Sequence, residues 1–201
     1  MTPVDAELVL ATRNDHKLRE FRRLLPDTPL CPLPDGVPSP EETGQTFADN
    51  ALIKAHAAVA VTGRASIADD SGIEAEALGG APGVRSARYA GEPVSDARNN
   101  AALVAALRGI ADRRAHYYCV LVLVRHADDP QPILAEGIWH GTIVDTPRGS
   151  GGFGYDPHFQ DAITGRTGAE LPLQRKNALS HRGKAMRRLI ARLEMLQRDG
   201  G

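Results

Sequence analysis

The 201-residue sequence predicts an α/β protein with a mixed β-sheet flanked by helices. Two observations support this class: helical and strand patterns alternate in the first half of the chain, and a hairpin-like meander follows in the second. A third is the valine-rich run Tyr117 to Val124, which is apolar on both faces, as in a central strand covered on two sides. No internal repeat or long linker interrupts the chain, so residues 1–201 are predicted to be a single domain.

The first elements follow from short runs and their flanking residues. Glu7 to Ala11 is apolar enough for a strand, and the capping and turn residues after it predict a helix that Pro26 ends. Residues 26–40 contain six prolines, so they predict a loop or an irregular sheet edge.

A second helix is predicted from Thr46, which together with Asp49 resembles a capping box with a shortened acid, to Gly63. Ser66 to Ala68 then reads as a brief strand that ends at the carboxylate pair Asp69-Asp70.

The remaining elements lie on either side of the central strand. Ser95 can cap a helix that ends at Gly109, and residues 133–144 read as returning strands interrupted by glycines. An amphipathic helix is predicted from near Ser180.

Composition excludes several classes of protein. The chain has 24 Lys and Arg against 25 Asp and Glu, and this balance argues against a nucleic-acid partner. The longest apolar run, residues 117–124, is too short to span a membrane. Met1 to Leu10 lacks the features of a targeting signal, and neither of the two cysteines lies in a CxxC pair. We therefore expect a cytoplasmic protein without a membrane partner, a zinc site or a disulfide scaffold.

The small net charge is the sum of opposed segments. Residues 35–80 hold eight acids against two bases, and residues 166–201 hold nine bases against three acids. This separation predicts an acidic, metal-binding side and a basic side that reads the base of a nucleotide.

Candidate chemistry begins with the neighbouring carboxylates of Asp69 and Asp70. Holding two carboxylates together favours a cation, with Mg²⁺ the obvious choice, although a solvated turn explains Asp-Ser-Gly equally well. Glu41 and Glu42 add carboxylates that, taken alone, are better explained as solvated loop charges.

Two groups of residues could bind anions. Thr12 to Lys17 sits at a strand-to-helix turn, where backbone N–H groups attract phosphate, although a plain helix cap explains the same residues. Lys176, His181 and Arg182 precede the last helix and could meet an anion or a carbonyl-rich base; a solvated basic face is the alternative.

Glycines at positions 149, 151 and 154 match GxGxxG, but Pro157 follows and no βαβ context is present, so we reject dinucleotide binding. The loop could still wrap a flat ligand beside Phe153 and Tyr155, or it could be a flexible connection. Walker and Gly-x-Ser-x-Gly patterns are absent from the sequence.

Several motifs, taken together and in order, resemble one family, the inosine/xanthosine triphosphate pyrophosphatases, from about residue 8 to residue 195. The motifs are Leu10-Ala11-Thr12-Arg13-Asn14 with Lys17, Glu41-Glu42-Thr43-Gly44 with Thr46-Phe47, Asn50-Ala51 and Lys54-Ala55, Ala68-Asp69-Asp70-Ser71-Gly72, Leu78-Gly79-Gly80-Ala81-Pro82-Gly83-Val84, Ser86-Ala87-Arg88-Tyr89, Gly151-Gly152-Phe153-Gly154-Tyr155-Asp156-Pro157, and Lys176 before Ser180-His181-Arg182-Gly183.

The resemblance implies Mg²⁺-dependent hydrolysis of ITP, dITP and XTP to the monophosphate and pyrophosphate. It also implies an elongated, two-lobed homodimeric enzyme with the active-site cleft between the lobes. It assigns the metal to Glu41 and Asp70, the general base to Asp70, and phosphate contacts to Lys17 and Lys54. Its substrate-binding positions are Thr12, Arg13, Asn14, Asp15, His16, Lys17, Ser71, Phe153, Gly154, Tyr155, Asp156, Lys176, His181 and Arg182.

Two residues depart from the family pattern: Arg13 stands where many members have glycine, and Asp49 replaces a common glutamate. Two alternative functions stay open. One is a pyrophosphatase for another modified nucleotide, and the other is a non-catalytic nucleotide-binding protein.

Overall fold

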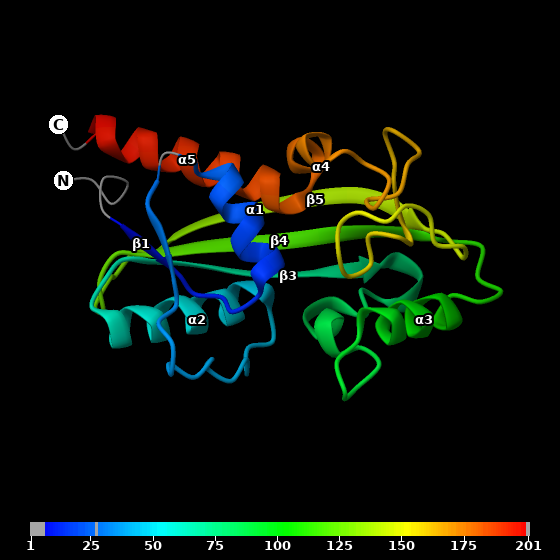
Figure 1. The fold of residues 1–201 in the computed structure, drawn as a ribbon, viewed down its shortest axis with the longest axis horizontal. Coiled ribbons are helices and arrows are strands. Elements are labelled where there is room, and N and C mark those ends of the chain that lie inside the picture. Colours follow the sequence, from blue (N-terminus) through cyan, green and yellow to red (C-terminus); the bar gives the residue numbers. More distant parts are fainter. Residues whose placement is uncertain (1–6, 27, 200–201) are drawn as a thin grey trace. The chain divides into compact units, whose positions relative to one another are not determined.

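The computed structural model describes residues 7–26 and 28–199 and confirms an α/β fold with a mixed sheet (Figure 1). Within these residues, six strands form one sheet in the order β2-β1-β3-β4-β5-β6. They are β1 (Leu8–Leu10), β2 (Leu30–Pro32), β3 (Ser66–Ala75), β4 (Arg114–Val124), β5 (Ile133–Ile143) and β6 (Phe159–Asp161). Strand β1 pairs in parallel with β2 and β3, whereas β5 and β6 are antiparallel.

The helices are α1 (Asp15–Leu24), α2 (Phe47–Thr62), α3 (Asp96–Ala106), α4 (Leu173–Leu179) and α5 (His181–Asp199), with short 3-10 helices η1 (Glu76–Leu78) and η2 (Gly83–Arg88). Helices α1, α2 and α3 begin where the sequence places capping residues. Thr46 and Asp49 form the predicted capping box of α2, and the Ser95 side chain caps α3. Caps of this kind stabilise a helix by about 1 kcal/mol each.

The chain divides into two compact units. Unit 1 comprises Met1–Asp70, Cys119–Gly137 and Arg182–Gly201, and unit 2 comprises Ser71–Tyr118 and Ile138–His181. The described part of unit 1 has α1 and α5 on one face of its strands and α2 on the other (Figure 1). The predicted cleft between two lobes stays a prediction, as does the single-domain boundary at residues 1–201, whose ends lie outside the described residues.

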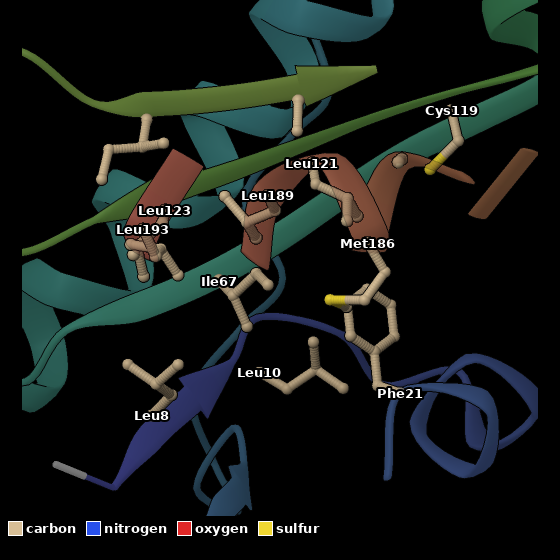
Figure 2. Packing of buried hydrophobic residues seen from close by; sticks show 13 residues of the cluster. Leu8, Leu10, Phe21, Ile67, Cys119, Leu121, Leu123, Met186, Leu189 and Leu193 are labelled. Atoms are coloured by element: carbon tan, nitrogen blue, oxygen red, sulfur yellow. The ribbon is translucent and has the colours of Figure 1, made fainter. Parts of the chain in front are cut away.

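The core of unit 1 joins its helices to the sheet. Phe21 of α1 and Met186 of α5 pack with Leu10, Ile67 and Leu121 of three strands (Figure 2). Each of these side chains is almost fully buried. Complete burial of a side chain of this size contributes about 1.5–3 kcal/mol, so this cluster fixes the strand that carries the two aspartates.

Unit 2 has a separate core that includes several aromatic side chains. Trp139, Tyr117 and Phe159 contact one another, with Tyr117 and Phe159 ring centroids 4.7 Å apart. The Trp139 indole N–H donates to Asp161 at 2.7 Å, which satisfies the one polar atom of that side chain.

Two strand predictions were wrong in extent. The expected strand ending at Asp69-Asp70 instead continues to Ala75, because each carboxylate finds cationic partners on its own face of the sheet. The residues expected to form interrupted strands form the single strand β5. Gly141 lies in it because any larger residue would collide with the Gln160 carbonyl oxygen of β6.

Two strands and one α-helix were not predicted as such, nor were the two short 3-10 helices. The proline-rich segment contains the short edge strand β2, which ends at Pro32, and an edge tolerates the missing N–H of proline. Strand β6 and helix α4 have three and seven residues, too few for a clear periodic pattern. Within the described residues, no helix is both long and apolar enough to cross a membrane.

Candidate active site

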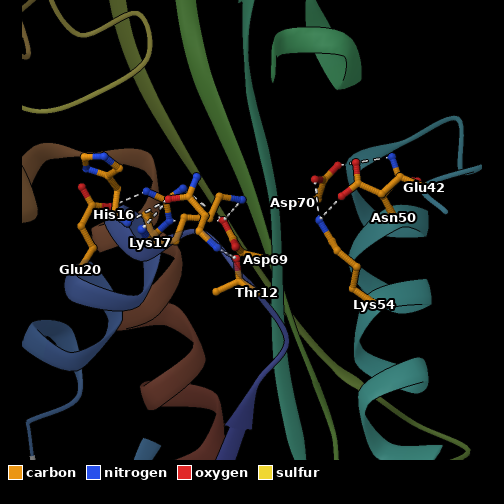
Figure 3. A network of polar contacts seen from close by, with 11 residues as sticks. Thr12, His16, Lys17, Glu20, Glu42, Asn50, Lys54, Asp69 and Asp70 are labelled. Atoms are coloured by element: carbon orange, nitrogen blue, oxygen red, sulfur yellow. Dashed lines mark hydrogen bonds and ion pairs between the residues drawn. The ribbon is translucent and has the colours of Figure 1, made fainter. Parts of the chain in front are cut away.

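The two neighbouring carboxylates point to opposite faces of β3, because successive side chains of a strand alternate. Figure 3 shows Asp70 facing Lys54, Asn50 and Glu42, with Asp69 facing Lys17. The two carboxylates of unit 1 therefore have different direct partners, but their charges still interact: Lys17 lowers the pKa of Asp70, and Lys54 lowers that of Asp69.

On one face, Asp70 is held by α2 and by the loop that precedes it. The Lys54 ammonium lies 2.8 Å from Asp70 Oδ1 and 3.0 Å from Glu42 Oε1. Asn50, one helical turn before Lys54, donates to Asp70 Oδ2 at 3.4 Å, and its own Oδ1 accepts from the Gly44 N–H at 2.8 Å. The capping box and this amide therefore set the start of α2 against the carboxylate.

Burial raises the pKa of Asp70, and this effect outweighs the opposing influence of the Lys54 ammonium. Burial alone would lower the pKa of Lys54, but the Asp70, Asp69 and Glu42 carboxylates raise it above its ordinary value. Lys54 is thus firmly cationic, while Asp70 binds a proton more readily than a solvent-exposed aspartate does.

On the other face, Asp69 lies between two cations. Its Oδ2 is 2.9 Å from the Lys17 ammonium and 3.1 Å from Arg182 Nη2. Arg182, only 2% exposed, also contacts the Glu20 carboxylate of α1. Burial would raise the pKa of Asp69, but Lys17 and Arg182 hold it well below its usual range. These four charges join α1, β3 and the start of α5.

This network shows that the acidic and basic segments of the sequence are not fully separate in the structure. Arg182 belongs to the basic segment of the sequence and Asp69 to the acidic one, yet they form an ion pair within unit 1. Burial explains the difference, because charges removed from water must be paired locally whatever their distance in sequence.

The predicted phosphate turn forms a capped helix N-terminus. The Asn14 side chain accepts hydrogen bonds from the His16 and Lys17 N–H groups at 2.9 and 3.2 Å. Arg13 turns toward the proline-rich segment and donates to the Pro34 carbonyl at 3.0 Å. Thr12 is half-buried, while positions 13–16 of the turn are exposed.

The base-side candidates in unit 2 gather around Asp156, which is 2% exposed. Its Oδ2 accepts from the Lys176 ammonium at 2.7 Å and from the Phe153 N–H at 2.8 Å. Lys176 also lies 4.9 Å from the centroid of the Phe153 ring. Gly152, at φ +72°, permits this turn, since any side chain there would collide with the Asp156 carboxylate.

The other two base-side candidates are buried. Tyr155 packs in the core of unit 2 and donates its hydroxyl to the Ser86 carbonyl at 2.7 Å, so its ring is not available to stack on a base. His181 stacks on Tyr117 with ring centroids 4.6 Å apart. The half-buried Phe153 is the aromatic side chain that remains near the loop surface.

The glycines at positions 149, 151 and 154, for which dinucleotide binding was rejected, lie against other parts of the protein. The Gly151 N–H donates to the Ala169 carbonyl at 2.9 Å, and a side chain at Gly149 would strike the Ala169 backbone. These glycines therefore permit close contact with the protein's own backbone. The next strand or helix along the chain is the strand β6, whereas a dinucleotide fingerprint opens a helix.

The residues around Asp70 fit a Mg²⁺ ion that takes only some of its ligands from the protein. Within the described residues, no group of three or more His, Cys, Asp and Glu side chains is placed to hold a metal. However, Mg²⁺ typically takes one or two carboxylates and completes its shell with water and substrate phosphates. Asp70 and Glu42 already converge on one cation, the Lys54 ammonium, and Glu41 is exposed beside Glu42.

Sequence reasoning assigned no role to Glu20 or Glu42. Glu20 lies one helical turn after His16 and is inconspicuous in a charged helix, but in the structure it is only 8% exposed and pairs with Arg182. Glu42 was considered only as a loop charge, and the position of Lys54 across the loop gives it a partner. Ser71 follows Asp70 on β3 and begins unit 2.

The protein is thus of the α/β class, and two neighbouring aspartates of its strand β3 each pair with a lysine from a helix. The model of the Ham1 family matches residues 8–192, so the chain belongs to the Ham1 family.

Similar proteins span almost the whole chain. A protein of Ralstonia nicotianae named dITP/XTP pyrophosphatase is 56% identical over 196 residues, covering 94% of this chain and 98% of its own. A Chromobacterium violaceum protein, also named dITP/XTP pyrophosphatase, is 56% identical over 193 residues, covering 94% of this chain and 98% of its own. The structure of a HAM1 protein from Coxiella burnetii has a TM-score of 0.87 at 45% identity, covering 94% of this chain and 98% of that one.

Proposed function

We propose that this protein hydrolyses the purine nucleoside triphosphates ITP, dITP and XTP to the monophosphate and pyrophosphate, removing deaminated nucleotides from the cellular pool. The observation that carries the proposal is Asp70, a 7% exposed carboxylate whose pKa burial raises and which Lys54 and Asn50 hold in place. The family membership and the activity named for the two relatives support the same reaction.

Asp70 acts as the general base in this proposal. A water molecule that attacks phosphorus must lose a proton, and a carboxylate of raised pKa accepts it more readily. Lys54 fixes Asp70 Oδ1 and supplies positive charge against the triphosphate. Lys17 supplies a second ammonium from α1, and the capped turn from Thr12 to His16 places it there.

Mg²⁺ would be held by Asp70 and Glu41, with Glu42 engaged by Lys54. When bound, the ion would neutralise phosphate charge and favour the leaving of pyrophosphate. The supporting observation is that Asp70 and Glu42, both hard oxygen donors, lie around Lys54, with Glu41 next to Glu42 in the sequence.

The base contacts are assigned to Lys176, Phe153 and the backbone of residues 153–156. Inosine and xanthine present a 6-oxo acceptor where adenine presents an amino donor, so buried donors reject the amino analogue. Lys176 is 5% exposed and lies beside the Phe153 ring, where it can donate to such an acceptor. Asp156 holds these groups through its contacts with the Lys176 ammonium and the Phe153 N–H, and His181 and Arg182 stay further proposed contacts to the substrate.

A substrate panel tests the proposal. We expect release of pyrophosphate from ITP, dITP and XTP at least about 100-fold more efficiently, by kcat/KM, than from ATP or GTP. EDTA should stop turnover, and added Mg²⁺ should restore it. Preference for another modified base would favour the alternative pyrophosphatase, and tight binding without turnover would favour the non-catalytic alternative.

We also propose a homodimer in the cytoplasm with no nucleic-acid or membrane partner. The family resemblance supports the dimer, and the near-zero net charge argues against nucleic acid. Cys31 and Cys119 are both unpaired thiols, which suits a reducing compartment. Light scattering on the purified chain should give twice the 21.5 kDa mass of one chain, and a mass of one chain would contradict the dimer.

A further inference from the structure

Two side chains of helix α3 form hydrogen bonds with the backbone N–H and carbonyl groups of Gly154. Asp96 Oδ2 accepts from the Gly154 N–H at 2.7 Å, and Asn100 Nδ2 donates to the Gly154 carbonyl at 2.8 Å. Asp96 and Asn100 are four residues apart in one helix, so their side chains project from the same face. All three residues belong to unit 2.

We propose that Asp96 and Asn100 are positioning residues that fix the loop of residues 153–156 and thereby set base selectivity. The inference rests on the proposed function, because it concerns the loop assigned to the nucleotide base. Neither side chain is assigned a contact with substrate, and both act through the loop backbone.

The two hydrogen bonds fix more than one residue. Because peptide groups are planar, holding the Gly154 N–H orients the peptide that joins Phe153 to Gly154. Holding the Gly154 carbonyl likewise orients the peptide that leads to Tyr155. Gly154 has φ +61°, and within the described residues nothing lies within 4 Å of where its Cβ would be. Packing therefore does little to restrain it, and the α3 contacts are what limit its rotation.

The rest of the loop is held by other partners. Phe153 donates its N–H to Asp156, and Tyr155 donates its hydroxyl to Ser86. Gly154 is the link between these two anchors. If it rotated, the Phe153 ring would move relative to the Lys176 ammonium, and the proposed base contacts would lose their alignment.

The orientation of the Asn100 amide is well determined. Its Nδ2 also donates to the Asp96 backbone carbonyl at 2.8 Å, so both partners of this nitrogen are acceptors. Asn100 is 7% exposed, which protects the bond to Gly154 from competition by water.

Amide hydrogen exchange of Gly154, measured by NMR on the labelled full-length chain, tests the clamp without reference to activity. We expect Asp96→Ala and Asn100→Leu each to speed exchange about 10-fold or more. Asp96→Asn keeps an acceptor oxygen and should stay within about threefold of the parent chain. Asn99→Leu is the matched control, because Asn99 is also a buried asparagine of α3 but bonds to the Ala87 carbonyl and the Ala90 N–H.

Selectivity is measured on the same variants as the ratio of kcat/KM for dITP to that for dGTP. We expect Asp96→Ala and Asn100→Leu to lower this ratio about 10-fold, with Asp96→Asn restoring it and Asn99→Leu leaving it unchanged. If Asp96 and Asn100 only stabilised the fold, the variants would have a lower melting temperature but an unchanged ratio of kcat/KM for dITP to that for dGTP. Asp96 is exposed, so its variant keeps the test available if Asn100→Leu fails to fold.

Two results would overturn the inference: unchanged Gly154 exchange in Asp96→Ala, or faster exchange with an unaltered selectivity ratio. A parent chain that hydrolyses no triphosphate would instead overturn the proposed function. The exchange measurement would still report whether α3 holds the loop, so the two failures are distinguishable.

Discussion

Replacing Asp70 by Asn is expected to lower kcat for dITP by roughly 10²–10⁴-fold, the usual contribution of a general base. The amide has the shape of the carboxylate but cannot take the proton of the attacking water. It also weakens the contact with Lys54. Initial rates of pyrophosphate release measure the effect.

The same variant should remain folded. Burial raises the pKa of Asp70, so ionising this carboxyl costs more in the folded chain than in water, and a neutral amide avoids that cost. Lys54 keeps a second carboxylate partner in Glu42. The melting temperature should therefore stay close to that of the parent chain. Near-normal turnover by a folded Asp70→Asn protein would refute the assignment of Asp70 as the base.

Replacing the neighbouring Asp69 by Asn is expected to have the opposite profile, with a loss of about 3–5 kcal/mol in the free energy of unfolding. Lys17 would lose its Asp69 partner, and the almost fully buried Arg182 would keep only one of its two carboxylate partners, Glu20. Urea unfolding measures the change. Asp112→Asn is the control, because the half-exposed Asp112 side chain pairs locally with the exposed Arg114. Removing that surface ion pair should not change the free energy of unfolding measurably.

The pH dependence of this loss follows from the pKa of Asp69, which is lower in the folded chain than its ordinary value of 3.8. A lowered carboxyl pKa stabilises the folded state above the unfolded value, and the contribution falls as pH drops below it. The stability difference between the parent chain and Asp69→Asn should be constant from about pH 5 to 8 and shrink below about pH 4. A difference that grows in acid would contradict the ion-pair explanation.

Local signals in the sequence predicted much of the fold. Capping residues such as Thr46, Asp49 and Ser95 act on N–H groups only two or three residues away, so their effect is visible in a short window. The end of β3 was missed because its continuation depends on Lys17 and Arg182, which stabilise Asp69 from distant parts of the chain. Strand β2 was missed because it is an edge strand whose pairing depends on β1.

The candidate site shows the same division between local and distant information. The motifs identified Asp70, Lys54 and the loop at residues 153–156, and the structure brings Lys54 to Asp70. They did not show that Asp69 and Asp70 face opposite ways, which requires the strand to pass through both. Nor could they indicate that Arg182 is paired with Glu20, since 162 residues separate the two in sequence.

The central claim is that water cleaves the bond between the α and β phosphates of a deaminated purine nucleotide. The most direct test incubates the purified protein with dITP and Mg²⁺ and resolves the products by ion-exchange chromatography. We predict one dIMP and one pyrophosphate for each dITP consumed, with no orthophosphate. Formation of dIDP and orthophosphate, or no turnover of dITP, would contradict the claim.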